Sequence, residues 1–169
     1  EHFSKELLES QNRREGVIIR FDEDNFWRQE GLNGKINTFR FGPQTSALDV
    51  FGDARVANSE SLTDQREAAI GLLRGYLEKE LDADSVFDVE LLGKFFAVTE
   101  LWAAEHAMAW HNIRFYFNPI TARLEPIGFD AEPSLDSYPP RLLSRNRSGL
   151  TIDLANDPSV SREYVRALE

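Results

Sequence analysis

The stretch HNIRFYFNPITARLEPIGFD, residues 111–130, decides the fold. Two runs rich in aromatic and β-branched residues flank the segment NPIT at 118–121, and Asn-Pro is typical of a turn. The pattern predicts a β-hairpin in which Phe117 faces Ala122. Because Pro126 cannot donate a hydrogen bond to a neighbouring strand, we expect its strand to lie at a sheet edge or to carry a bulge there.

Two helices are predicted before the hairpin. The first spans about 62–81 and opens at Ser61, with Asp64 in an arrangement resembling a capping box. The second begins at Asp88, a good N-cap residue, and runs to about Trp110. Its apolar stripe follows the helical period and comprises Leu92, Phe96, Ala103, His106 and Trp110. We expect this second helix to form the buried spine of the domain.

The remaining segments carry weaker patterns. We expect a helix over 1–14, a strand over 17–21, a loop over 23–58 with short strands at 38–41 and 48–51, a loop over 131–157, and a final helix over 161–169. The three tryptophans are expected in the core: Trp27, Trp102 and Trp110. Together these elements predict an α+β domain that is mostly helical with a functional β-hairpin.

Composition limits the classes of function. The chain has 169 residues, 41% hydrophobic and 28% charged, which is typical of one globular domain. Its formal charge of -10 argues against a general nucleic-acid binder and favours basic partners or a site that holds a cation. The absence of cysteine excludes disulfides, thiolate nucleophiles and Cys-ligated zinc. No apolar run approaches the ~20 residues of a membrane-spanning helix.

The hairpin register predicts where chemistry would sit. If Phe117 faces Ala122, Asn112 lies near Ile127, and Asp130 arrives beside the end of the long helix that carries His106. The oxygen atoms of an Asp and an Asn suit magnesium, which takes its remaining ligands from water and phosphate. A further group one turn away could orient or deprotonate a nucleophile.

Residues 115–130, preceded by His111-Asn112, resemble the core segment of the spore-coat CotH kinase-like family. Members of that family carry a helix, a catalytic loop, a tyrosine-rich strand, a turn containing Asp/Asn-Pro and a second strand that ends in Asp. Residues 88–101 are similar to the family's helix before the catalytic loop. The similarity covers about 86–133, and it is loose over 1–22.

The resemblance implies the C-terminal lobe of an atypical protein kinase, which transfers phosphate from ATP to serine of a protein with the help of Mg²⁺. It places Asp130 at the metal-binding aspartate of the family. Residues 100–107 align with the catalytic loop, so that His106 occupies the position of the catalytic aspartate and Ala104 replaces an asparagine. A neutral imidazole can accept a proton, but it does not supply the fixed negative charge of an aspartate.

Further candidates lie around this corner. Arg114 and Arg123, on neighbouring strands, are candidates for binding phosphate or substrate, or for pairing with Glu125 across the hairpin. The other candidate site residues are Glu100, Glu105, His111 and Glu132. For His111 we favour a cap at the helix C-terminus over a metal ligand.

Two further classes of function stay open. One is a non-catalytic binding or scaffold module on a kinase-like fold, which His106 and Ala104 favour. The other is a hydrolase that uses Glu100 or Glu105 with Asp130 as a carboxylate pair. Both ends of the chain have helix-interior sequence, so we expect 1–169 to be a single-domain fragment whose nucleotide-binding lobe lies upstream of Glu1. The partner expected from charge and resemblance is a basic or serine-rich protein, and the compartment stays open.

Overall fold

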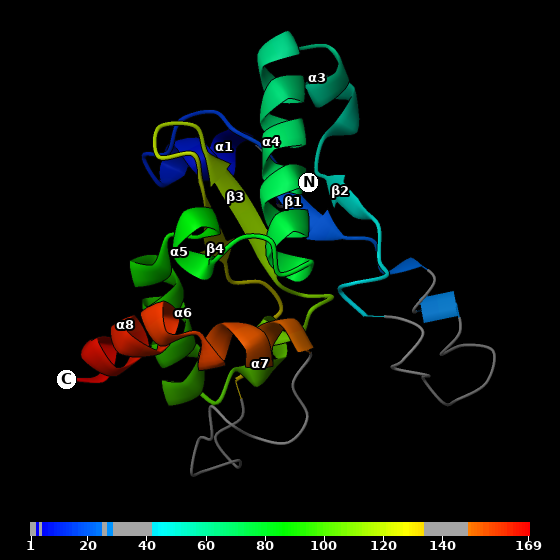
Figure 1. Cartoon of the computed structure of the whole chain (residues 1–169). Helices are drawn as coiled ribbons and strands as arrows, with labels where there is room; N and C mark the ends of the chain where they lie inside the picture. Colours follow the sequence, from blue (N-terminus) through cyan, green and yellow to red (C-terminus); the bar gives the residue numbers. More distant parts are fainter. Residues whose placement is uncertain (1–2, 4, 25–26, 29–41, 134–148) are drawn as a thin grey trace.

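The structure is a computed structural model that describes residues 3, 5–24, 27–28, 42–133 and 149–169. Figure 1 shows an α+β chain in which helices surround a small sheet. The elements are α1 (Lys5–Ser10), β1 (Ile18–Phe21), β2 (Leu48–Val50), α3 (Asp53–Ala57), α4 (Glu60–Leu77), α5 (Ala83–Val86), α6 (Val89–Leu101), the 3-10 helix η1 (Glu105–Met108), β3 (Arg114–Asn118), β4 (Arg123–Ile127), α7 (Gly149–Asn156) and α8 (Pro158–Leu168).

The predicted hairpin is β3–β4, and it belongs to an antiparallel sheet of order β2-β1-β3-β4. Strand β4 lies at an edge, which is one of the two alternatives expected from Pro126. Strand β3 is central, and all five of its residues are buried. The hairpin therefore places β3 in the middle of the domain. Because β4 is paired with β3, the start of the segment that follows β4 is fixed in position.

The register of the hairpin differs from the expected one by two residues. Phe117 faces Leu124, and Asn118 faces Arg123. The turn explains the shift, because the Asn118 side chain accepts a hydrogen bond from the Ile120 amide at 2.9 Å and keeps Asn118 in the strand. Ala122 then closes the loop in the left-handed region, with φ 52°.

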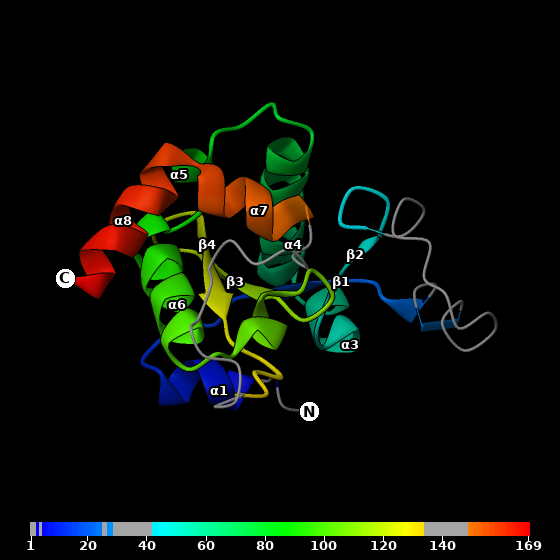
Figure 2. The ribbon, with the colours of Figure 1, turned by 90° about the horizontal axis from the view of Figure 1, so that it is seen from below.

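The two faces of the sheet are covered unequally. One face contributes Ile19, Phe115 and Leu124 to the main core, where they pack with residues of α4, α5, α6, α7 and α8. The other face packs Ile18 and Tyr116 against residues of the N-terminal segment and α1. Figure 2 shows α1 on one side of the sheet and α7 and α8 on the other.

Helix α6 is shorter than expected. Asp88 is its N-cap, and the Asp88 side chain accepts a hydrogen bond from the Leu91 amide at 3.0 Å. The helix ends at Leu101, because Ala103 takes a left-handed conformation with φ 48° and η1 follows. The expectation of one helix to Trp110 is therefore wrong, and His106 lies on a separate turn.

Other boundaries also move. Helix α4 begins after Ser59, whose side chain accepts from the Leu62 amide, so the expected cap at Ser61 is wrong. The first helix is α1, much shorter than 1–14, and α7 occupies part of the expected loop over 131–157. The final helix was expected, but it begins at Pro158 behind the Asp157 cap. The expected strand at 38–41 lies outside the described residues.

Of the three tryptophans, only Trp110 is buried as expected. Trp27 is 48% exposed and Trp102 is 61% exposed, so their assignment to the core is wrong. Trp102 directly follows α6, where the chain turns away from the helical stripe. Within the described ranges, no helix combines the length and the apolar character that crossing a bilayer requires.

The packing of α6 against α8 depends on a glycine. A Cβ atom built at Gly93 would lie 2.6 Å from the backbone carbon of Glu163 and 2.6 Å from the backbone nitrogen of Tyr164. These are backbone atoms that no side-chain rotation can move, so the two helices touch here because position 93 has no side chain.

We expect Gly93→Ala to destabilise the fold by about 2 kcal/mol, because overpacking outweighs the better helix propensity of alanine. The measurement is the free energy of unfolding from urea titration. Gly71→Ala is the matched control, since a Cβ atom at this exposed position of α4 meets nothing within 4 Å. The control should gain up to about 1 kcal/mol. Equal effects of both substitutions would contradict the close helix contact.

Candidate functional site

The structure places Asp130 beside His106. Asp130 follows β4 and His106 lies in η1, and the His106 Nε2 atom is 3.2 Å from the Asp130 Oδ2 atom. Both side chains are partly exposed, so the contact lies at the surface and is open to a ligand. The hairpin thus brings together two groups that are 24 positions apart in the chain, although its register differs from the expected one.

Glu132 joins the same corner. One ligand atom from each of His106, Asp130 and Glu132 lies within 4.8 Å of the others. We refer to these three residues as the His106 corner. Two carboxylates at this spacing repel each other, and a divalent cation would remove that repulsion. Oxygen ligands fit Mg²⁺, and imidazole extends the choice to Mn²⁺ and Zn²⁺.

The backbone at the corner is strained. Asp130 and Glu132 have positive φ angles of 49° and 39°. A left-handed conformation costs a non-glycine residue about 1–2 kcal/mol, and aspartate tolerates it better than most. Both of these residues offer a carboxylate oxygen within 4.8 Å of a His106 ring nitrogen, and strain of this kind is common at functional sites.

Asn112 supports the His106 corner through a hydrogen bond to the backbone of His106. Its side chain is buried, and its Nδ2 atom donates a hydrogen bond to the backbone carbonyl of His106 at 3.2 Å. The backbone N–H of Asn112 also donates a hydrogen bond to the backbone carbonyl of Ala109 at 2.8 Å. Asn112 therefore holds η1, which carries His106, in place.

His111 lies in an aromatic cluster next to the corner. Its ring contacts those of Trp27 and Trp110 edge-on, each at 5.6 Å between centroids, and that of His106 at 6.0 Å. The position follows η1 instead of the long helix that the sequence suggested, so the expected helix cap is wrong. The cluster forms one wall of the corner.

The two candidate arginines lie at opposite ends of the hairpin. Arg114 faces Ile127 near the exit toward Asp130, whereas Arg123 is exposed and faces Asn118 at the turn. The pair Arg114–Ile127 and the pair Asn118–Arg123 are four residues apart along β3, which corresponds to about 13 Å. Arg123 is therefore remote from the His106 corner.

Arg114 is the buried member of this pair. Its side chain is only 3% exposed, and its guanidinium donates to the carbonyl of His111 and to the Glu23 carboxylate, the latter at 3.3 Å. Burial lowers the pKa of Arg114, an effect that Glu23 opposes and Arg20 reinforces. Glu23 is a partner that sequence reasoning missed, since 91 positions separate it from Arg114.

The expected carboxylate candidates have other surroundings. Glu100 accepts a hydrogen bond from the Tyr164 hydroxyl across the α6–α8 contact. The Glu105 side chain lies outside the described part. Glu125 is buried, pairs with Arg13 at 2.9 Å and accepts from Asn118 at 2.6 Å. The idea that Glu125 pairs with Arg114 or Arg123 is therefore wrong.

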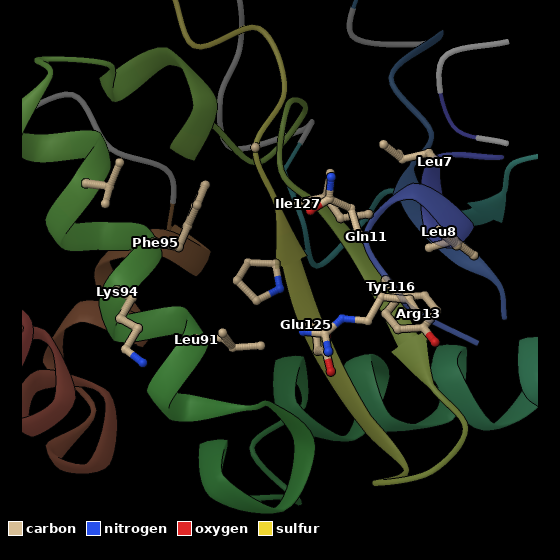
Figure 3. A pocket seen from close by; sticks show the side chains of 13 residues that line it. Leu7, Leu8, Gln11, Arg13, Leu91, Lys94, Phe95, Tyr116, Glu125 and Ile127 are labelled. Atoms are coloured by element: carbon tan, nitrogen blue, oxygen red, sulfur yellow. The ribbon is translucent and has the colours of Figure 1, made fainter. Parts of the chain in front are cut away.

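A groove of about 470 Å³ opens elsewhere, between α1, α6 and β4 (Figure 3). Its lining is largely apolar and includes Leu7, Leu8, Leu91, Phe95 and Ile127. Figure 3 shows Leu91 and Phe95 of α6 facing the strand that carries Glu125. None of its described lining residues belongs to the His106 corner, so the groove is a separate feature.

We expect Asn112→Ala to destabilise the protein by about 1–2 kcal/mol, because the hydrogen bond from the buried Asn112 side chain to the His106 carbonyl is lost without a replacement. Asn58→Ala is the matched control, since Asn58 donates the same kind of bond to the Ala54 carbonyl at 2.7 Å on the exposed surface. The control should lose less than about 0.5 kcal/mol. Urea unfolding of both variants is the measurement, and equal losses would show that Asn112 does not hold η1.

Comparisons with family models, with curated proteins and with solved structures find no match to this chain.

Proposed function

We propose that the His106 corner holds a divalent cation and serves phosphoryl transfer from ATP to serine of a protein, in a CotH-like, kinase-like domain. The observation that carries the proposal is the 3.2 Å contact between His106 and Asp130, joined by Glu132. The family resemblance assigns the catalytic position to residue 106 and the metal aspartate to residue 130. These two positions are far apart in sequence, and their contact in space supports the assignment.

The donor set fits a cation. Asp130 and Glu132 offer carboxylate oxygens, and His106 offers a ring nitrogen. A bound Mg²⁺ would neutralise charge on the phosphates of ATP. Asn112 fixes the carbonyl of His106 and so keeps the imidazole at the corner.

His106 and Asp130 also suit proton transfer. In this role His106 does not bind the cation, which the carboxylates of Asp130 and Glu132 hold. Nε2–H donates to Asp130 Oδ2, and Nδ1 is left as the acceptor for a serine hydroxyl proton. The carboxylate then orients the imidazole and stabilises its protonated form, as in other Asp–His pairs. The acidic charge of the whole chain favours a basic or serine-rich protein as the substrate.

A second candidate is a non-catalytic binding module on the same fold. Ala104 stands where the family has an asparagine, and its side chain is buried and carries no ligand atom. A corner with one ligand fewer would bind a cation and a partner without transferring phosphate.

The first experiment measures the thermal shift of the full-length protein with Mg²⁺ and ATP for the wild type, Asp130→Asn and Asp64→Asn. Saturation to 100 times Kd stabilises by about 2.7 kcal/mol, which raises the Tm of a chain of this size by roughly 5–10 °C. The shift should vanish in Asp130→Asn and persist in Asp64→Asn, since Asp64 is an exposed carboxylate on α4. Equal shifts in the wild type and Asp130→Asn would remove Asp130 from the site.

The second experiment separates catalysis from binding. His106→Asp restores the family's residue, and phosphate transfer to a serine-rich basic peptide is measured for this variant and the wild type, each as the full-length protein. Transfer by either protein supports the kinase function. Cation binding without transfer by both supports the non-catalytic module.

A further inference from the structure

A second hollow of the molecule has a volume of about 800 Å³. It is lined by Phe129, the residue directly before Asp130 of the His106 corner. It is bounded by β1, the end of β2, the start of α3, β3 and the residues after β4. Its lining includes three arginines and three phenylalanines: Arg20, Arg55, Arg114, Phe3, Phe51 and Phe129. We call it the arginine pocket. Its volume is in the range of small-molecule sites.

The arginines are arranged around aromatic rings. The guanidinium of Arg20 lies 4.9 Å from the Phe51 ring centroid, and that of Arg114 lies 5.8 Å from the same centroid. Arg114 is also 5.3 Å from the centroid of Phe129. Cation–π contacts hold these side chains in place, so the cationic groups are positioned before a ligand arrives.

Each arginine of the pocket pairs with one carboxylate, and of these three partners only Glu23 lines the pocket itself. Three arginines face two acidic lining residues, Glu23 and Asp53. Arg20 makes a single contact with Asp49 at 3.2 Å, and Arg55 a single contact with Glu15 at 2.8 Å. A guanidinium has five donors, and among the described residues these single carboxylate contacts leave several donors of both unused; both side chains are about one third exposed.

Two buried hydrogen-bond donors of these arginines lack a partner. In the part of the chain that the structure describes, the Nε atoms of Arg20 and Arg114 are buried and have no hydrogen-bond partner. An unpaired buried donor is costly, and the proximity of two guanidiniums is unfavourable as well. An anion in the pocket would relieve both costs.

We propose that the arginine pocket binds a small organic anion that joins a phosphate or carboxylate group to a flat apolar ring. The oxyanion contacts Arg20 and Arg55 above the buried charge of Arg114, and the ring packs against Phe51 and Phe129. The pocket uses none of the residues of the His106 corner, so this binding needs no metal ion and goes beyond the proposed function.

The test is calorimetric titration of the whole chain in EDTA with phenyl phosphate, benzoate, inorganic phosphate and phenol. Phenyl phosphate or benzoate should bind at least tenfold tighter than both inorganic phosphate and phenol, because each of the last two offers only half of the contacts. The better of the two aryl anions tells whether phosphate or carboxylate is preferred. If neither aryl anion binds more tightly than phosphate and phenol, the proposal is wrong.

Substitutions place the ligand. Arg20→Gln and Arg55→Gln should each weaken aryl-anion binding about tenfold, the effect of losing a charge-assisted hydrogen bond. Arg123→Gln is the control, since it removes an exposed arginine at the far end of the hairpin and should leave the affinity unchanged. Unchanged affinity in both pocket variants, with circular dichroism reporting a native fold, would overturn the proposal.

Asp130→Asn separates this proposal from the proposed function. Its aryl-anion affinity in EDTA should equal that of the wild type. If binding instead requires a divalent cation and is lost in Asp130→Asn, the anion sits on the His106 corner, which overturns the arginine pocket and leaves the proposed function standing. If aryl anions bind in EDTA while Mg²⁺ and ATP give no thermal shift, the pocket stands and the proposed function fails.

Discussion

The burial of strand β3 is the constraint on which the rest of the structure depends. Its five residues are all buried between β1 and β4, with helices over one face and α1 over part of the other. Every backbone group of such a strand must be paired, so its two neighbours are fixed in place. The arginine pocket at one end of β3 and the segment that carries Asp130 both inherit their positions from this pairing.

The hairpin and most of the regular elements could be predicted, because their signals are local. Three consecutive aromatic residues marked β3, the Asn-Pro turn marked its end, and Pro126 indicated that β4 is an edge strand or carries a bulge. The register of the hairpin could not be predicted, because it depends on whether the Asn118 side chain accepts a hydrogen bond from the backbone of the turn. The end of α6 was also hidden, since alanine gives no warning that Ala103 takes a left-handed conformation.

Only the part of the candidate site that follows from the hairpin geometry could be predicted from the sequence. Folding the hairpin back brought Asp130 to His106 even with a register two residues off, because a shift by two residues leaves every side chain on the same face of the sheet. The Arg114–Glu23 pair and the Asn112 bond to the His106 carbonyl depend on how separate elements pack. Such contacts are tertiary and have no sequence pattern of their own.

Phe129 and Asp130 are neighbours in the chain, yet Phe129 lines the arginine pocket while Asp130 contacts His106. A single peptide unit therefore connects a place suited to negative charge with a place suited to positive charge. If the ligands proposed for these two adjoining places affect each other's affinity, the effect is reciprocal: any gain in affinity that the first confers on the second is returned in equal measure.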